Sequence, residues 1–136
     1  MKRPLLITYQ LLVGLSDTST GLLLIVAPSL TLHMMKLPVL ANTPPFLSFI
    51  GAFVLSVGLA CFYGALLATR PVSTPKLETV WLLTAITRAS VALVLCAKIF
   101  TGDLASGWAT VAISDGAIAL LQLIGLSRGW LTHAAD

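Results

Sequence analysis

Long apolar stretches alternate with short polar or proline-containing breaks along this chain of 136 residues. Four stretches stand out, at residues 5–27, 46–69, 77–100 and 104–127. Each is about 24 residues long, and a helix that rises ~1.5 Å per residue would then cross a hydrocarbon core of ~30 Å. Helices are expected because lipid offers no partners for free backbone groups. The pattern predicts an all-α fold, a four-helix transmembrane bundle that forms a single domain over residues 1–136.

The breaks predict the connections between these stretches. Pro28 follows the first stretch, and Pro44 and Pro45 precede the second. A Thr-Gly-Asp sequence at residues 101–103 predicts a tight turn, so the third and fourth stretches are expected to form an antiparallel hairpin. The first connection is longer, and its residues 29–37 fit either a short helix on the membrane surface or an irregular loop.

Composition narrows the class of protein. Hydrophobic residues make up 57% of the chain and charged residues only 10%, whereas soluble domains carry about 25% charged residues. A soluble enzyme, a disordered tail and a nucleic-acid-binding protein are therefore excluded. The net charge of +3 comes from scattered basic residues rather than from one basic face. The lipid bilayer is the expected partner.

The scattered basic residues predict an orientation. Five of them fall on the side of the two termini, namely Lys2, Arg3, Arg70, Lys76 and Arg128. Only Lys36 and Lys98 approach the other side. Since cytoplasmic loops carry the excess of Lys and Arg, both termini are expected in the cytoplasm. Trp81 and Trp108 are expected near the two membrane interfaces.

The second stretch carries a row of small residues that recur every four positions. These are Ser48, Ala52, Ser56, Ala60, Gly64 and Ala68. Gly51 and Gly58 add a second row, one heptad apart. Small residues let helix backbones approach closely in lipid. A tightly packed helix is predicted, with its partner either in this chain or in another copy.

Three ionisable residues, Asp17, Arg88 and Asp115, lie at the middle of the first, third and fourth stretches. A central Asp or Arg costs ~2.5–3.5 kcal/mol on insertion scales, so three unpaired charges would cost roughly 8–10 kcal/mol. Arg88 can bridge two carboxylates because its guanidinium presents several donors in a planar fork. Contacts between Arg88 and both aspartates are predicted. The sequence leaves open whether both carboxyl groups are ionised.

Further polar residues lie at helical spacing from these three charges. Gln10 shares a helix face with Asp17, Thr84 lies one turn before Arg88, and Tyr9 could reach toward the inner mouth. Trp108 and Gln122 each lie seven residues from Asp115. A polar seam through the bundle is expected, and its candidate site residues are Asp17, Arg88, Asp115, Gln10, Gln122, Thr84, Trp108 and Tyr9.

Other chemistry finds little support in the sequence. His33 and His133 both flank the stretches, so no metal site is expected. No cofactor is evident, because the chain has no Gly-rich phosphate loop and no central Lys. Cys61 and Cys96 lack a C-x-x-C arrangement and are expected as small buried apolar residues.

Short motifs resemble the small four-span bacterial membrane proteins of the DoxX-like group and their uncharacterised relatives. They are Gly21-Leu22-Leu23 with Pro28 after it, Phe49-Ile50-Gly51-Ala52-Phe53, Val57-Gly58-Leu59, and Asp115. The better-known members carry an Arg early in the first span and a Gly-Lys near its end, which this chain lacks. The resemblance implies a bacterial cytoplasmic membrane. It also implies an accessory role, since some members are linked to quinone-coupled oxidoreductase complexes.

Several functions remain open at this point. The charged cluster could bind or translocate a small polar or amphipathic ligand or a proton, because charges inside the membrane are candidate functional groups. It could instead only fix helix register. The chain could be a non-catalytic subunit of a homo-oligomer or of a larger membrane complex. It could also be an intramembrane acid/base enzyme, an isomerase or cyclase, that acts on a lipid-like substrate.

Overall fold

The computed structural model of the chain describes residues 2–37, 43–70 and 74–132, and in this part the chain is helical, without strands. The elements are α1 (Arg3–Val26), α2 (Pro28–Met34), α3 (Thr43–Ala68), α4 (Thr74–Phe100), the 3-10 turn η1 (Ser106–Trp108) and α5 (Ala109–Ser127). Four segments are long and apolar enough to cross a membrane, with η1 and α5 forming the last. The all-helical class and the four predicted stretches are confirmed.

Prolines mark where these helices begin. A proline stands in the first turn of both α1 and α2, and α4 begins with Thr74-Pro75, three residues before the predicted start. This position suits proline because the first backbone N–H groups of a helix have no partner within it. The residues after Pro28, which fitted either a helix or a loop, form helix α2. The turn at residues 101–103 has Gly102 at φ 80°, a value that favours glycine.

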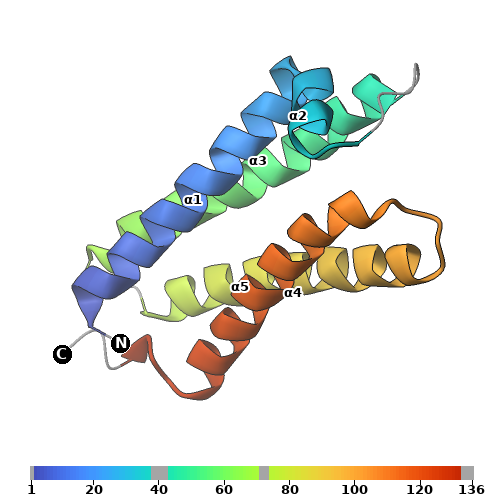
Figure 1. Cartoon of the computed structure of the whole chain (residues 1–136). Helices are drawn as coiled ribbons and strands as arrows, with labels where there is room; N and C mark the ends of the chain where they lie inside the picture. The colour runs from blue at the N-terminus through green and yellow to red at the C-terminus, as the bar shows by residue number, and fades with distance from the viewer. Residues whose placement is uncertain (1, 38–42, 71–73, 133–136) are drawn as a thin grey trace.

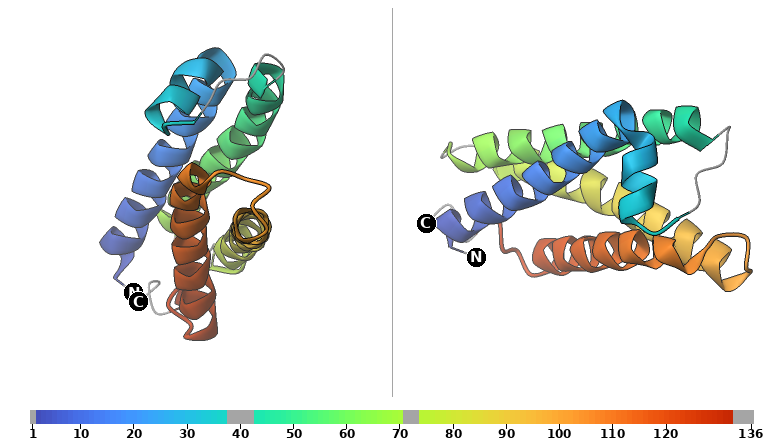
Figure 2. Two further views of the ribbon diagram at one scale, coloured as in Figure 1. Left: turned by 45° about the vertical axis from the view of Figure 1, so that its right-hand side comes forward. Right: turned by 45° about the horizontal axis from the view of Figure 1, so that its top comes forward.

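Two helical hairpins make up the molecule (Figure 1). One consists of α1 and α3 with α2 at its tip, and the other consists of α4 and α5. Two further views show the hairpins crossing, with the beginning of α1 and the end of α5 at the same end of the bundle (Figure 2). The helix order also places the five basic residues Lys2, Arg3, Arg70, Lys76 and Arg128 at this end.

In the first hairpin, the backbones of α1 and α3 lie in close contact. A Cβ added at Gly21 would lie 2.6 Å from the backbone nitrogen of Leu55, and one at Gly51 would lie 2.8 Å from the carbonyl oxygen of Gly21. One at Gly58 would lie 2.7 Å from the backbone nitrogen of Thr18. The second row of small residues is therefore the face along which α3 meets α1.

The row with four-residue spacing follows a different course. Ser48 donates to the carbonyl oxygens of Leu24 and Ile25, and Gly64 and Ala68 are buried, but Ala60 is half-buried and Ala52 and Ser56 are exposed. Four residues advance about 40° around a helix, whereas seven return to within about 20° of the starting direction. The row therefore winds around α3 and is not one packing face within this chain.

The two ends of the bundle differ in packing. At the end with the basic residues, called here the closed end, side chains from both hairpins share one core of Leu6, Leu67, Ala68, Leu77, Trp81 and Leu131. Arg3 adds a hydrogen bond from Nε to the carbonyl oxygen of Ala68 at 2.8 Å. At the opposite end, called the open end, a smaller core of Leu24, Leu32, Leu37 and Leu47 attaches α2 to α1 and α3, and Trp108 of the second hairpin packs against it.

Two expectations drawn from single residues prove wrong. Trp81, expected as an anchor at a membrane interface, lies toward the closed end but is completely buried there, where Tyr9 packs on it with ring centroids 5.3 Å apart, so its ring does not reach the surface. Cys96, expected to be buried, is exposed on α4, whereas Cys61 is buried. Spacing along a helix gives no direct information on which face a neighbouring helix covers.

Candidate functional site

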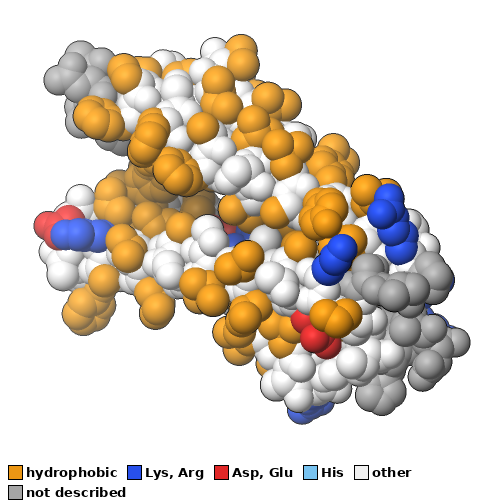
Figure 3. Space-filling view, turned by 180° about the vertical axis from the view of Figure 1, so that it is seen from behind, with side chains coloured by type: hydrophobic (Ala, Val, Ile, Leu, Met, Phe, Trp, Pro, Cys, Tyr) orange, Lys and Arg blue, Asp and Glu red, His pale blue; other side chains and the backbone are white. Residues whose placement is uncertain are grey.

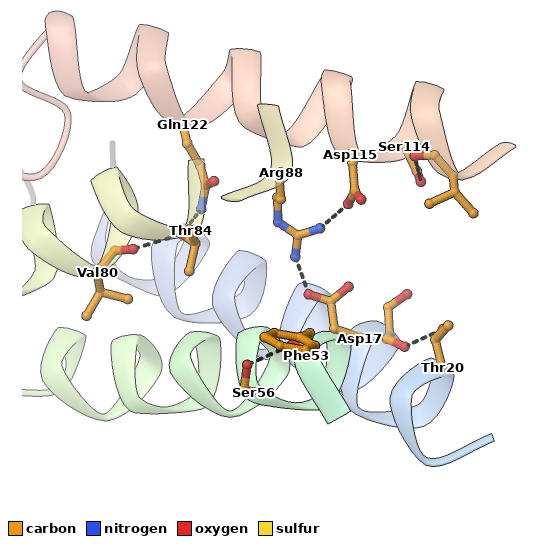
Figure 4. Close-up of polar contacts among 12 residues, drawn as sticks. Asp17, Thr20, Phe53, Ser56, Val80, Thr84, Arg88, Ser114, Asp115 and Gln122 are labelled. Carbon is orange, nitrogen blue, oxygen red and sulfur yellow. Dashed lines mark hydrogen bonds and ion pairs between the residues drawn. The ribbon is translucent and has the colours of Figure 1, made fainter. Parts of the chain in front are cut away.

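Arg88 of α4 joins the two hairpins through both predicted aspartates (Figure 4). Its Nη1 donates to Oδ1 of Asp115 on α5 at 2.6 Å, and its Nη2 donates to Oδ2 of Asp17 on α1. The predicted contacts across three helices are confirmed. The Asp17–Arg88–Asp115 group, called here the charge cluster, carries one positive and two negative formal charges.

Burial differs between the members of the charge cluster. The side chain of Arg88 is 4% exposed, while those of Asp17 and Asp115 are 14% and 19% exposed. Figure 4 shows both carboxyl groups on the side of the guanidinium that faces Thr20 and Ser114. The carboxylates therefore cover the arginine on that side.

A second polar contact lies toward the closed end. Nε2 of Gln122 donates to Oγ1 of Thr84 at 3.0 Å, and that hydroxyl donates in turn to the carbonyl oxygen of Val80. Figure 4 shows this pair on the opposite side of Arg88 from Thr20 and Ser114. The seven-residue spacing of Asp115 and Gln122 thus aligns two polar contacts along one face of α5.

The remaining predicted site residues separate into two places. Gln10 is completely buried in the closed end, and neither its side chain nor the Tyr9 hydroxyl has a hydrogen-bond partner in the described part of the chain. Trp108 lies in η1, at the open end. In place of the expected continuous seam, the described residues form a charge cluster, a Thr84–Gln122 pair and separate polar residues, and no side-chain hydrogen bonds among these described residues link the three groups.

A cleft of about 810 Å³ separates the hairpins at the open end, and the charge cluster forms its floor. Figure 3, seen from behind, shows hydrophobic side chains lining the hollow between the hairpins. Its lining includes Val57 of α3, Val94 of α4, Met34 of α2 and Trp108. Pockets that hold small molecules commonly measure about 300–1,000 Å³ and combine apolar walls with few polar groups.

Sequence reasoning missed most of these cleft walls. Phe53, Val57, Val91 and Val94 are apolar residues within apolar stretches, so their composition gives no signal that distinguishes them from lipid-facing residues. Met34 and Met35 lie in the first connection, for which the sequence allowed either a short helix or an irregular loop. Sequence reasoning identified the charged residues of the cleft floor because charged side chains are rare within apolar stretches.

Fold and site together define a class: a small all-helical protein, with four helices of membrane-spanning length and a cleft whose floor is a buried charge cluster. These properties suggest an integral membrane protein. No family model, curated protein or solved structure matches the chain. Among the described residues, no group of three His, Cys, Asp or Glu side chains could hold a metal ion.

Proposed function

We propose that this chain is a membrane-embedded binding protein for a small amphipathic molecule. The observation that carries the proposal is the cleft of about 810 Å³ with a charge cluster on its floor and apolar walls. A polar head group on the floor would meet hydrogen-bonding partners, while a hydrocarbon tail would lie against Val57, Val91 and Val94. Both termini would lie in the cytoplasm, and the cleft would then open toward the outer leaflet.

The position of the charges supports this function over a purely structural role. Charges that only fix helix register would be covered by close packing. Trp81 and Leu6, which are apolar, are covered in this way at the closed end. Asp17 and Asp115 instead line the cleft. The bacterial cytoplasmic membrane is the location that the resemblance to the DoxX-like group implies.

Blocking the cleft tests this proposal. Val94→Phe places a larger side chain in the wall, whereas its neighbour Leu93, 71% exposed and outside the cleft, offers Leu93→Phe as a matched control. Thermal unfolding in nanodiscs is followed while C10 amphiphiles with cationic, neutral and anionic heads are added. A ligand that binds only the folded state raises the Tm with its concentration and affinity.

Wild type and Leu93→Phe should show a saturable rise in Tm with at least one amphiphile, and Val94→Phe should not. Equal responses in all three proteins, or no saturable response in the wild type, would contradict a binding role for the cleft.

A second candidate function is that of a subunit in a larger membrane assembly. Ala52 and Ser56 favour it, because they expose small side chains on α3 where another helix could approach closely. Purification in mild detergent tests this alternative. A partner or second copy that is lost on Ala52→Leu would support it, whereas a stable, folded monomer would count against it.

A further inference from the structure

We propose that the cleft selects a positively charged head group, so that its ligand is an alkylammonium amphiphile. This inference rests on the proposed binding function and names the chemical class of its ligand. It follows from which atoms of the floor and walls face the cleft.

The charge cluster turns its negative side to the cleft. Both terminal nitrogens of Arg88 are used by the two carboxylates, and the arginine side chain is only 4% exposed. Each carboxylate is more exposed than the guanidinium, and each keeps an oxygen that Arg88 does not bind. Figure 4 places both carboxylates on the side of Arg88 that faces Thr20 and Ser114, which line the cleft. An incoming head group therefore meets carboxylate oxygen before it meets guanidinium nitrogen.

The net charge of the residues that line the cleft also favours a cation. Asp17, Arg88 and Asp115 are the charged residues among those that line the cleft, and with both aspartates ionised they sum to −1. A monovalent cation would bring the site to zero, whereas an anion would bring it to −2. Charge interactions are strong where water is scarce, so this difference dominates the choice of head group.

The hydroxyl groups of the cleft also favour a cation. Five of the seven hydroxyl residues donate their hydrogen to the backbone carbonyl three or four residues earlier, which leaves oxygen lone pairs free to accept. They are Thr20, Thr31, Thr87, Thr110 and Ser114. A sulfate or carboxylate head needs donors, and these five groups have already used theirs, which leaves only Ser16 and Ser90 among the hydroxyl residues of the cleft. The aromatic faces of Trp108 and Phe53, which also line the cleft, can attract a cation.

The experiment compares three head groups on one tail: decyltrimethylammonium, decanol and decyl sulfate. Each is titrated into the protein in nanodiscs of a zwitterionic lipid, and the saturable rise in Tm gives an apparent affinity. Responses of Val94→Phe, whose cleft is blocked, are subtracted to remove effects of the membrane itself. We expect decyltrimethylammonium to bind roughly tenfold or more tightly than decyl sulfate, with decanol between them.

A second measurement uses Asp115→Asn, which keeps an oxygen for Arg88 but removes one negative charge. The variant should lose most of the preference for the cation, even if its Tm without ligand is lower. A Ser127→Ala control, at the end of α5 and outside the cleft, should keep the wild-type preference.

The outcomes separate the inference from the proposed function. If decanol or decyl sulfate binds as tightly as the cation in the wild type, the cleft binds amphiphiles but the charge selection is wrong. If none of the three shows saturable binding that Val94→Phe abolishes, the proposed function itself fails. An unchanged preference in Asp115→Asn would also overturn the inference.

Discussion

Two aromatic residues illustrate how differently the ends of this bundle are built. Trp81 is completely buried at the closed end, in a core to which α1, α3 and α4 all contribute. Phe53 of α3 lies at the open end with 60% of its surface exposed, and it lines the cleft. Both belong to strongly apolar helices. The difference arises from the distance between the hairpins rather than from hydrophobicity.

The charge cluster lies where one kind of packing gives way to the other. Toward the closed end, Gln122 and Thr84 are buried against each other. Toward the open end, hydroxyl and apolar side chains line the cleft. The ion pair between Asp17 and Arg88 connects the first hairpin to the second at this boundary. Apolar packing thus joins the hairpins in the closed-end core and again where Trp108 meets the smaller core, and the charge cluster joins them between these two places.

Removing the arginine should break this arrangement most severely. Arg88→Met leaves two carboxylates near each other without a counter-charge, and the free energy of unfolding should fall by about 3–5 kcal/mol. Reversible unfolding in mixed micelles with increasing dodecyl sulfate measures the change. Lys98→Met is the matched control, because Lys98 lies on the same helix in an ion pair whose side chains are 56% and 58% exposed.

The control should lower the free energy of unfolding far less than Arg88→Met does, because exposed ion pairs contribute little. The triple variant Arg88→Met/Asp17→Asn/Asp115→Asn should recover much of the loss, since it no longer buries unpaired charge. If Arg88→Met is as stable as Lys98→Met, the cluster does not hold the hairpins together.

Truncating one aromatic residue at each end tests the comparison directly. Trp81→Ala removes a fully buried side chain and should lower the free energy of unfolding by about 3 kcal/mol or more, because the surrounding core cannot fill the space. Phe53→Ala should cost less than about 1 kcal/mol, because its ring already borders the cleft. Equal losses in the same unfolding assay would mean that the open end closes in solution.

A pair of glycines tests whether the open end is loose within each hairpin or only between the hairpins. Gly21→Ala would push a methyl group against the backbone of α3, with Leu55 nitrogen at 2.6 Å, and should cost about 1–3 kcal/mol. Gly116→Ala meets its nearest neighbour, Cβ of Ala92, at 3.6 Å and should be neutral or slightly stabilising. A neutral Gly21→Ala would contradict close packing of α1 on α3.

The helices and the contacts of Arg88 could be predicted from the sequence, because long apolar stretches and isolated charges within them leave few alternatives. Four apolar stretches of membrane-spanning length give the helices, and three charges at matching depth give the contacts of Arg88. Such charges are costly when unpaired, so their partners can be predicted without knowledge of the packing.

The cleft and the burial of single residues could not be predicted in this way. Whether Val94 faces lipid, a neighbouring helix or a cleft depends on the crossing of two hairpins, and an apolar side chain suits all three surroundings. The same ambiguity misplaced Trp81 and Cys96. The four-residue row on α3 did not predict the packing face for another reason. Residues four apart wind around the helix, whereas Gly51 and Gly58, seven apart, stay on one face.

The smallest expected effect concerns the exposed ion pair at the open end. Lys98 Nζ and Thr101 Oγ1 each donate to Oδ2 of Asp103 at 3.0 Å, and these hydrogen bonds hold the pKa of Asp103 below its usual value. Lys98→Met should therefore raise this pKa, which a carbon-13 titration of the carboxyl group measures. Because the folded pKa is lowered, the pair adds stability above the unfolded pKa of about 3.9 and loses it as the pH falls through the folded value.

The pH dependence separates this exposed pair from the charge cluster. Any difference in stability between wild type and Lys98→Met should disappear at pH values below the folded pKa of Asp103, and it should shrink in high salt because exposed charges are screened. The loss caused by Arg88→Met should persist in high salt, since its partners are largely shielded from solvent by the protein. If salt abolished both effects equally, the charge cluster would be as solvated as the surface pair, and the boundary between the closed and open ends would have no energetic basis.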